Sequence, residues 1–179
     1  MISSLFFKKI IMDEELFFAT DSIDGIIFDI IVSTTGVREV LINKKQTPRS
    51  LDNAIQISPD DPKVLRIFKQ LTEYFKRERK EFALGLEIIG TNFQKKVWDE
   101  LSKIPYGATI SYGELASRVG DKNKMRAVAA ANSANPIPII IPCHRVIGAD
   151  GSLTGYGGDL YVKQKLLELE GSWSLSLFR

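Results

Sequence analysis

Residues 111–134, SYGELASRVGDKNKMRAVAAANSA, carry the clearest fold signal in this chain. Ser111 is a typical helix N-cap, and the apolar residues that follow it recur at helical spacing up to Val119. Residues 120–123 predict a turn that opens with glycine, and residues 124–134 predict a second helix. Two helices joined by a short turn of this kind are typical of a helix-turn-helix.

The second of these helices offers an unusual surface for reading DNA. It presents mostly methyl groups and one arginine, Arg126, whereas major-groove recognition normally uses several Arg, Asn or Gln side chains. A small, smooth helix is better suited to a narrow minor groove. A buried, alanine-rich packing helix stays open as the alternative. The net charge is only +2, and the positive charge is local, with a single acid, Asp121, among Arg118, Lys122, Lys124, Arg126 and Arg145.

The N-terminal half is rich in β-forming residues. Residues 25–32 and 37–42 are short apolar runs separated by turn residues, which predicts antiparallel strands. Residues 58–62 predict a helix start, and the apolar positions from 64 to 75 follow helical spacing. We expect that helix to cover one face of the sheet.

A second unit begins near Thr91, where Gln94 three positions later completes a capping-box pattern. The sequence therefore predicts an α+β protein of two domains. Residues 1–85 would form a small supporting domain of β-sheet plus helix. Residues 86–179 would form a helical, winged-helix-like helix-turn-helix domain that carries the active site.

Downstream of the helix-turn-helix, residues 139–141 are three isoleucines, which predict a buried strand or extended core segment that delivers Cys143 to the edge of the core. Cys143 and His144 are the only cysteine and the only histidine of the chain. Neither a disulfide nor a zinc site of about four Cys and His ligands can therefore form within one chain. Free cysteine is often simply buried. The glycine-rich loop of residues 148–158 instead favours a pocket wall and a reactive thiol.

The run from Gly90 to Gly171 closely resembles the O6-alkylguanine-DNA alkyltransferases, also called methylated-DNA–protein-cysteine methyltransferases. Six blocks carry the resemblance, in order and with natural spacing: residues 90–98 (GTNFQKKVW), 104–107 (IPYG), 111–112 (SY), 126–128 (RAV), 135–139 (NPIPI) and 141–146 (IPCHRV). The N-terminal half resembles the family only in general shape.

The resemblance implies a catalytic role for four residues. Cys143 would be the nucleophile that takes an alkyl group from O6 of guanine in DNA, once per molecule. His144 would act as the base through a water, Glu170 would orient His144, and Asn135 would link the recognition helix to the active-site segment. An ordinary thiol has a pKa near 8.5, so an oriented base should raise its reactive fraction.

The resemblance also implies a DNA-binding face. Tyr112 would contact the base or the flanking phosphate, and Arg126 would enter the base stack in place of the extruded nucleotide. Extrusion is expected because a thiol in a buried pocket cannot reach O6 of a stacked guanine. Gly157 stands where some relatives carry serine or arginine, which leaves the accepted alkyl size open. The other residues expected to contact substrate or DNA are Ala127, Ala131, Pro138, Val146, Tyr156 and Gly157.

The expected partner is double-stranded DNA that contains O6-alkylguanine, with O4-alkylthymine as a second candidate substrate. We expect a monomer, with cooperation along DNA left open, and no cofactor. No metal is expected either, because residues 1–84 lack the Cys and His ligands that hold zinc in some relatives. A free thiol suits a cytoplasmic or, in a eukaryote, nuclear protein, and no apolar stretch approaches the roughly 20 residues of a membrane span.

Two other functions compete with alkyl transfer. A non-enzymatic protein that binds alkylated bases would share the same fold, but such relatives replace the reactive cysteine, which is present here. A cysteine hydrolase normally takes its base from a distant position in the sequence, whereas the single imidazole of this chain is adjacent to the thiol.

Overall fold

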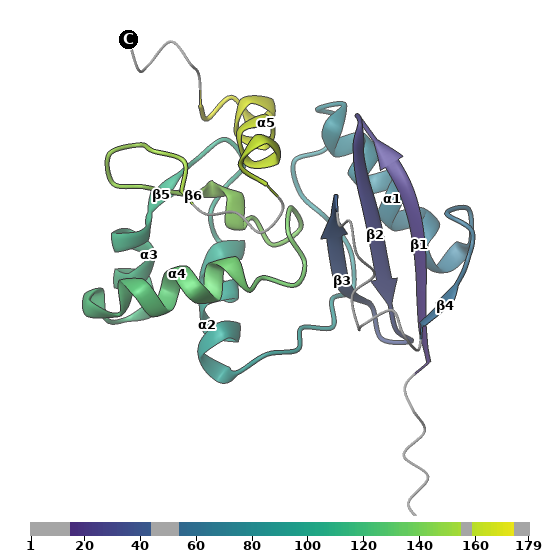
Figure 1. Cartoon of the computed structure of the whole chain (residues 1–179), viewed down its shortest axis with the longest axis horizontal. Coiled ribbons are helices and arrows are strands. Elements are labelled where there is room, and N and C mark those ends of the chain that lie inside the picture. The colour runs from purple at the N-terminus through teal and green to yellow at the C-terminus, as the bar shows by residue number, and fades with distance from the viewer. Residues whose placement is uncertain (1–14, 44–53, 155–158, 174–179) are drawn as a thin grey trace, which may run out of the picture.

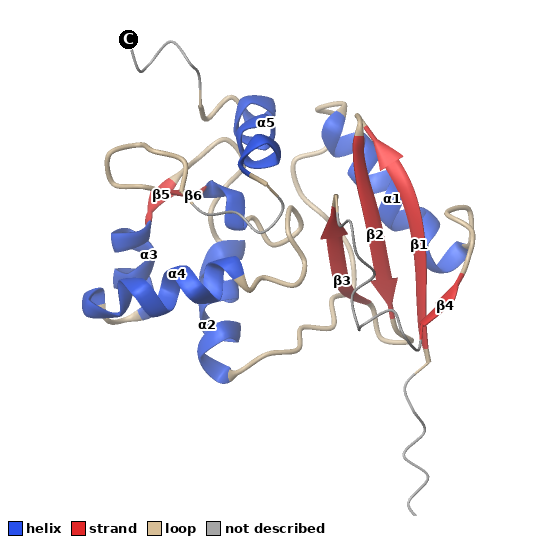
Figure 2. Cartoon of the chain, viewed as in Figure 1, coloured by secondary structure: helices blue, strands red, loops and turns tan. Residues whose placement is uncertain are grey.

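The structure is a computed structural model that describes residues 15–43, 54–154 and 159–173. It places a β-sheet with one long helix beside a cluster of shorter helices (Figure 1). All the longer strands belong to the N-terminal half, and four of the five α-helices belong to the C-terminal half (Figure 2). The predicted α+β fold is confirmed. Within the described ranges, no helix is long and apolar enough to cross a membrane.

Four strands form a mixed sheet in the order β3-β2-β1-β4. β1 (Leu16–Ile23), β2 (Ile26–Val32) and β3 (Val37–Ile42) are antiparallel neighbours, and β4 (Ala54–Gln56) runs parallel to β1. The two predicted strands are β2 and β3, whereas β1 was not among the predicted runs. The turn between β1 and β2 consists of Asp24 and Gly25, with φ of 53° and 76°. Two successive positive φ angles match the twist of the flanking strands, so this turn sets the register of the hairpin.

α1 (Pro62–Phe75) covers one face of this sheet. Asp61 caps it by accepting a hydrogen bond from the backbone N–H of Lys63, and proline occupies the first turn, where its missing N–H costs nothing. The rings of Phe28 and Phe75 meet edge to face with centroids 5.9 Å apart. The predicted helix and its position on the sheet are both confirmed.

The edge of β3 is paired with segments that come later in the chain. The N–H of Val37 donates to the carbonyl of Gly85, and the N–H of Glu87 donates to the carbonyl of Val37, at 2.9 and 2.8 Å. Further along the same edge, the N–H of Val40 donates to the carbonyl of Pro136 at 2.8 Å. One hydrophobic core runs through both halves. The domain boundary between residues 85 and 86 stays a prediction.

α2 (Asn92–Ser102) begins with the predicted capping box, in which Thr91 and Gln94 exchange hydrogen bonds between side chain and backbone N–H. Trp98 is buried on this helix, and its indole N–H donates to the carbonyl of Ala131 at 2.8 Å. Gly90 lies so close to the Trp98 ring that an added Cβ would be 2.6 Å from it. The glycine therefore lets the chain enter the helix against the tryptophan.

The helix-turn-helix is confirmed. α3 (Tyr112–Val119) starts at the Ser111 cap and ends at Gly120, whose φ of 107° is the left-handed conformation that favours glycine. A short 3₁₀ turn, η2 (Lys122–Lys124), leads into α4 (Met125–Ser133). Two short strands, β5 (Ile110–Ser111) and β6 (Val146–Ile147), pair in parallel beside these helices.

The strand or extended core segment expected at residues 139–141 is wrong, although Ile139 and Ile141 are buried. Ile139 has a φ of 74°, and the N–H of Ile141 donates to the carbonyl of Ile137 at 2.9 Å, so the chain turns here. Pro136, Pro138 and Pro142 supply no N–H to a strand ladder, which makes a turn the better solution. The chain then enters η3 (Cys143–Arg145), a 3₁₀ turn, and the last helix of the described residues is α5 (Leu160–Glu170).

Candidate active site

Cys143 begins η3 and is only 4% exposed. Its N–H donates to the carbonyl of Ile141 at 2.8 Å, and its carbonyl accepts from the side-chain amide of Asn132 at 3.4 Å. Burial raises the pKa of the thiol to about 11, against the opposing effects of Asn135 and Lys163. The thiol is therefore protonated at neutral pH, and the increase in reactive thiolate that an oriented base would bring stays a prediction.

His144 follows directly, is fully buried, and contacts the last residue of α5. Its Nε2 lies 3.0 Å from Oε1 of Glu170. Burial lowers the pKa of His144 in spite of the carboxylate beside it, so the imidazole is neutral at pH 7. Nδ1 is buried and has no hydrogen-bond partner among the described residues.

Glu170 is ionised. Burial alone would raise the pKa of this carboxyl, but hydrogen bonds from His144 and Arg145 outweigh it and lower the pKa to about 2. An ionised carboxylate only accepts hydrogen bonds, so Nε2 of His144 carries the ring proton. The lone pair of the imidazole is then on Nδ1, where it can take a proton.

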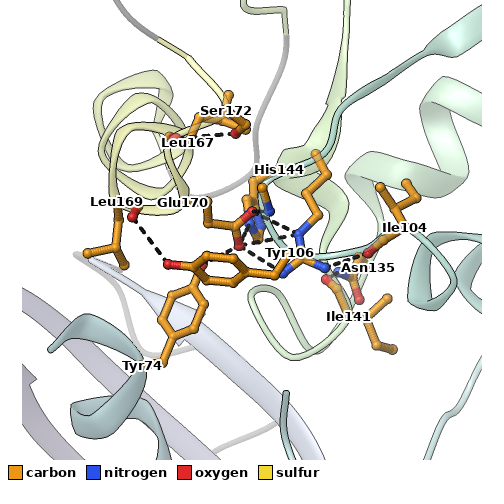
Figure 3. A network of polar contacts seen from close by, with 12 residues as sticks. Tyr74, Ile104, Tyr106, Asn135, Ile141, His144, Leu167, Leu169, Glu170 and Ser172 are labelled. Atoms are coloured by element: carbon orange, nitrogen blue, oxygen red, sulfur yellow. Dashed lines mark hydrogen bonds and ion pairs between the residues drawn. The ribbon is translucent and has the colours of Figure 1, made fainter. Parts of the chain in front are cut away.

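The carboxylate of Glu170 is the centre of a buried polar network (Figure 3). Arg145 donates to both of its oxygens through Nε and Nη2, and Nη1 of the same guanidinium donates to the carbonyl of Ile104 at 2.6 Å. Tyr74 donates to Oε1 at 2.6 Å, and the N–H of Gly107 donates to Oε2 at 3.2 Å. Arg145 is thus a buried structural cation, whereas the sequence analysis counted it among local basic residues.

Lys163 on α5 is a further buried cation that the sequence analysis missed. It is 0% exposed, and its ammonium donates to the carbonyls of Val146 at 2.6 Å and Thr154 at 2.9 Å. Burial lowers its pKa to about 8, and the neighbouring Cys143 opposes that shift. The sequence offered one signal of this burial. Lys163 is next to the apolar Val162 and seven positions before Glu170, so on a helix Lys163 and Glu170 share a face.

The structure brings Tyr112 and Asn135 to the same region. Tyr112 is half-buried at the start of α3, and its hydroxyl lies 3.5 Å from the amide nitrogen of Asn132. Asn135 follows α4 and braces the turn before Cys143, since its amide donates to the carbonyl of Ile141 at 2.8 Å. Its oxygen accepts from the N–H of Ile137 at 3.0 Å. It therefore connects the end of the second helix to the cysteine segment.

The remaining predicted contacts are divided between exposed and buried positions. Arg126 and Ala127 are exposed on α4, and Pro138 is half-buried. Ala131 is 4% exposed, and its carbonyl accepts the Trp98 indole N–H; its DNA contact stays a prediction. Val146 is also buried, with its carbonyl bonded to Lys163. Tyr156 and Gly157 lie outside the described residues.

No candidate metal site is found in the described part of the chain. No group of three or more His, Cys, Asp or Glu side chains is arranged there to hold an ion. The chemistry that the described residues offer is a thiol, a neutral imidazole oriented by a carboxylate, and a buried ammonium, next to a helix-turn-helix.

Comparison with known proteins points to one family. Residues 92–172 match the family model described as the 6-O-methylguanine DNA methyltransferase, DNA binding domain. The methylated-DNA–protein-cysteine methyltransferase of Mycobacterium leprae is 54% identical over 112 residues, which are 63% of this chain and 68% of that protein. The inducible enzyme of the same name from Bacillus subtilis is 37% identical over 169 residues, 93% of this chain and 90% of that protein.

The chain belongs to the methylated-DNA–protein-cysteine methyltransferase family.

Solved structures of this methyltransferase family share the whole fold. The crystal structure of Mycobacterium tuberculosis O6-methylguanine methyltransferase superposes with a TM-score of 0.81 at 38% identity, covering 92% of this chain and 99% of that one. The crystal structure of Mycobacterium tuberculosis OGT in complex with DNA superposes with a TM-score of 0.77 at 41% identity, covering 87% and 92%. The N-terminal half is therefore part of the methyltransferase fold as well.

Proposed function

We propose that this protein repairs DNA by transferring the alkyl group of O6-alkylguanine to Cys143, and that each molecule does so once. The observation that carries the proposal is the arrangement of a buried thiol beside a neutral His144 whose Nδ1 is unpartnered among the described residues. Family membership supplies the substrate class, since relatives more than 50% identical carry the name methylated-DNA–protein-cysteine methyltransferase.

The reaction needs a base, because the thiol has a raised pKa. A water between Sγ and Nδ1 of His144 would carry the thiol proton to the imidazole, while Glu170 stabilises the imidazolium that forms. The sulfur then forms a bond to the alkyl carbon as the bond between that carbon and O6 breaks. The electron pair stays with the guanine, which takes up one proton.

The raised pKa of Cys143 has a function in this scheme. A protonated, 4% exposed thiol reacts slowly with adventitious electrophiles, because the thiolate is the nucleophile. Deprotonation of the thiol then depends on His144 as the general base. The product is a thioether, from which no group leaves easily, so the cysteine is not regenerated.

The DNA must deliver the guanine to this buried sulfur by extrusion from the duplex. The exposed side of α4 carries Arg126 and Ala127 and suits a minor groove, where an arginine can fill the space that an extruded base leaves. Tyr112 would contact the extruded nucleotide. Double-stranded DNA with O6-alkylguanine is accordingly the proposed partner. We propose that the protein acts on it as a monomer. Because the substrate is DNA, the proposed location is inside the cell.

The test is the intact-protein mass after incubation with a duplex that carries one O6-methylguanine. The mass should increase by one methyl group in place of one hydrogen, with the lesion duplex and not with an unmodified duplex. A Cys143→Ala variant should bind the lesion duplex and gain no mass. Tight lesion binding by the wild type without any gain in mass would instead identify a damage-binding protein and overturn the proposal.

A further inference from the structure

The Tyr74 side chain connects the N-terminal half to the active site. Tyr74 lies near the end of α1, is 0% exposed, and donates its hydroxyl hydrogen to Oε1 of Glu170 at 2.6 Å. The two residues are 96 positions apart in the sequence. Figure 3 shows the phenol directed from the N-terminal half towards the carboxylate, on which His144 also converges.

Tyr74 and His144 share the same carboxylate oxygen. Oε1 of Glu170 receives Tyr74 at 2.6 Å, Nη2 of Arg145 at 2.8 Å and Nε2 of His144 at 3.0 Å. Oε2 receives Nε of Arg145 at 3.0 Å and the N–H of Gly107 at 3.2 Å. Tyr74 is thus the contact from α1 in a set whose other donors all come from the C-terminal half.

The packing around Tyr74 holds its hydroxyl in one place. Its ring contacts those of Phe75, Phe82 and Tyr106, with centroids 5.6, 5.5 and 6.0 Å away. Burial, reinforced by the charge of Glu170, raises the phenol pKa well above its ordinary value. The hydroxyl therefore remains a hydrogen-bond donor over the whole physiological pH range.

We propose that Tyr74 is a positioning residue for alkyl transfer, which fixes Oε1 of Glu170 against Nε2 of His144 and so makes the N-terminal half part of the active site. The inference rests on the proposed role of His144 as the base. It assigns to the sheet-and-helix half a task beyond supporting the C-terminal half.

The hydroxyl also competes with His144, beside the guanidinium of Arg145, for the negative charge of Oε1. If it is removed, the carboxylate attracts the proton on Nε2 more strongly, and the imidazolium form of His144 gains stability. Within the described residues, the charged or titratable groups that face His144 are Glu170 and Lys163 from α5, Arg145 and Cys143 from its own turn, and Tyr74 acting through Glu170 from α1. All except Tyr74 are unchanged in a Tyr74→Phe variant.

The experiment compares Tyr74→Phe with Tyr106→Phe. Tyr106 is a matched control, because its hydroxyl donates to the main-chain carbonyl of Leu169 at 3.2 Å and not to the carboxylate. Single-turnover methyl transfer from an O6-methylguanine duplex should be about tenfold slower in Tyr74→Phe, because the lost alignment of Glu170 with His144 outweighs the gain in basicity of the imidazole. Tyr106→Phe should match the wild type.

His144 is the only histidine of the chain, so nuclear magnetic resonance can follow its titration without assignment ambiguity. The pH at which it protonates should rise in Tyr74→Phe and stay unchanged in Tyr106→Phe. Both variants must first be shown to be folded. If Tyr74 were purely structural, Tyr74→Phe would then neither slow methyl transfer nor shift the His144 titration. If Tyr74→Phe does not fold, the wild type should still show a slowly exchanging, downfield hydroxyl proton with a nuclear Overhauser contact to the His144 ring, and its absence would overturn the proposal.

A double-mutant cycle with Glu170→Gln further distinguishes a positioning role of Tyr74 from a purely structural one. Because Tyr74 acts through Glu170, Tyr74→Phe should have no additional effect on transfer in the Glu170→Gln background. Additive effects, or an unshifted His144 titration in Tyr74→Phe, would overturn the inference while wild-type transfer stands. A wild type that transfers no methyl group would overturn the proposed function itself.

Discussion

Arg145 and Glu170 form an ion pair in which both partners are buried, with Nη2 of the guanidinium 2.8 Å from Oε1 of the carboxylate. The residues are 6% and 7% exposed, so water screens neither charge to any extent. The guanidinium also lies 5.9 Å from the centre of the Tyr106 ring. Each charge is stable in this position only because the other is present.

Removing one partner should therefore cost much more than removing a surface pair. We expect Arg145→Met to lower the free energy of unfolding by about 3–5 kcal/mol, because Glu170 loses its counter-ion inside the protein. The matched control is Arg118→Met, which breaks the exposed pair of Arg118 with Glu114, where the nitrogen and oxygen are 2.7 Å apart. That loss should be about 0.5 kcal/mol, as for other pairs of this kind. Urea unfolding measures both, and equal losses would contradict the buried-pair argument.

The same network predicts how stability depends on pH. The pKa of Glu170 is lowered to about 2 in the folded protein, so its contribution is present above the unfolded value of about 4.3 and is lost as pH falls towards 2. The lowered pKa of His144 acts in the same direction from about pH 6.5 downwards, because the unfolded chain then binds the additional proton. The urea midpoint should fall from pH 7 to pH 3, and Glu170→Gln should flatten the lower part of that curve. A midpoint unchanged between pH 5 and pH 3 would refute this prediction.

Lys163 should control the reactivity of Cys143. The Lys163 ammonium lowers the pKa of the thiol, so Lys163→Met should raise that pKa further and slow alkylation by iodoacetamide at pH 7, where the ammonium is mostly protonated, by about tenfold for each unit of the increase. Lys165→Met is the control, since Lys165 pairs with Asp24 at 2.9 Å in the N-terminal half. An unchanged rate in Lys163→Met would show that its charge does not reach the sulfur.

Binding to DNA should depend only modestly on salt. Among the basic residues of η2 and α4, Lys124 pairs with Asp121, whereas Lys122 and Arg126 have no ion-pair partner within the described residues. Two to three phosphate contacts predict a slope of log K against log salt of about −2 to −3. Arg126→Ala should reduce that slope by about 1, and Arg118→Ala, which loses an already paired arginine, should not. Fluorescence anisotropy at several salt concentrations measures this slope, and a slope steeper than about −5 would show that more basic residues contact phosphates than proposed here.

The parts of the fold that the sequence predicted are those set by contacts between near neighbours. The caps at Thr91 and Ser111 bond to backbone groups three residues away, so the sequence around each cap is sufficient to identify it. The Cys143–His144 pair was equally visible, because it is adjacent and has no competitor in the chain.

The contacts between distant residues could not be predicted in this way. Nothing in the helical pattern of α1 distinguishes Tyr74 from the other aromatic residues around it, and its partner is 96 positions away. Lys163 looks like an ordinary lysine of an amphipathic helix until the fold buries it. The turn at residues 137–141 resembles a strand because consecutive isoleucines are typical of strands, but the neighbouring prolines lack the N–H groups that a strand ladder needs.

The hydrogen bond from Val40 to Pro136 has a consequence for how the chain is made. A ribosome releases the four strands of the sheet long before it has added residue 136, so the outer edge of β3 emerges with an unpaired N–H. An exposed strand edge of this kind attracts other chains. The interval between synthesis of the sheet and synthesis of the active-site segment is therefore the period in which the nascent chain is most exposed to misassembly.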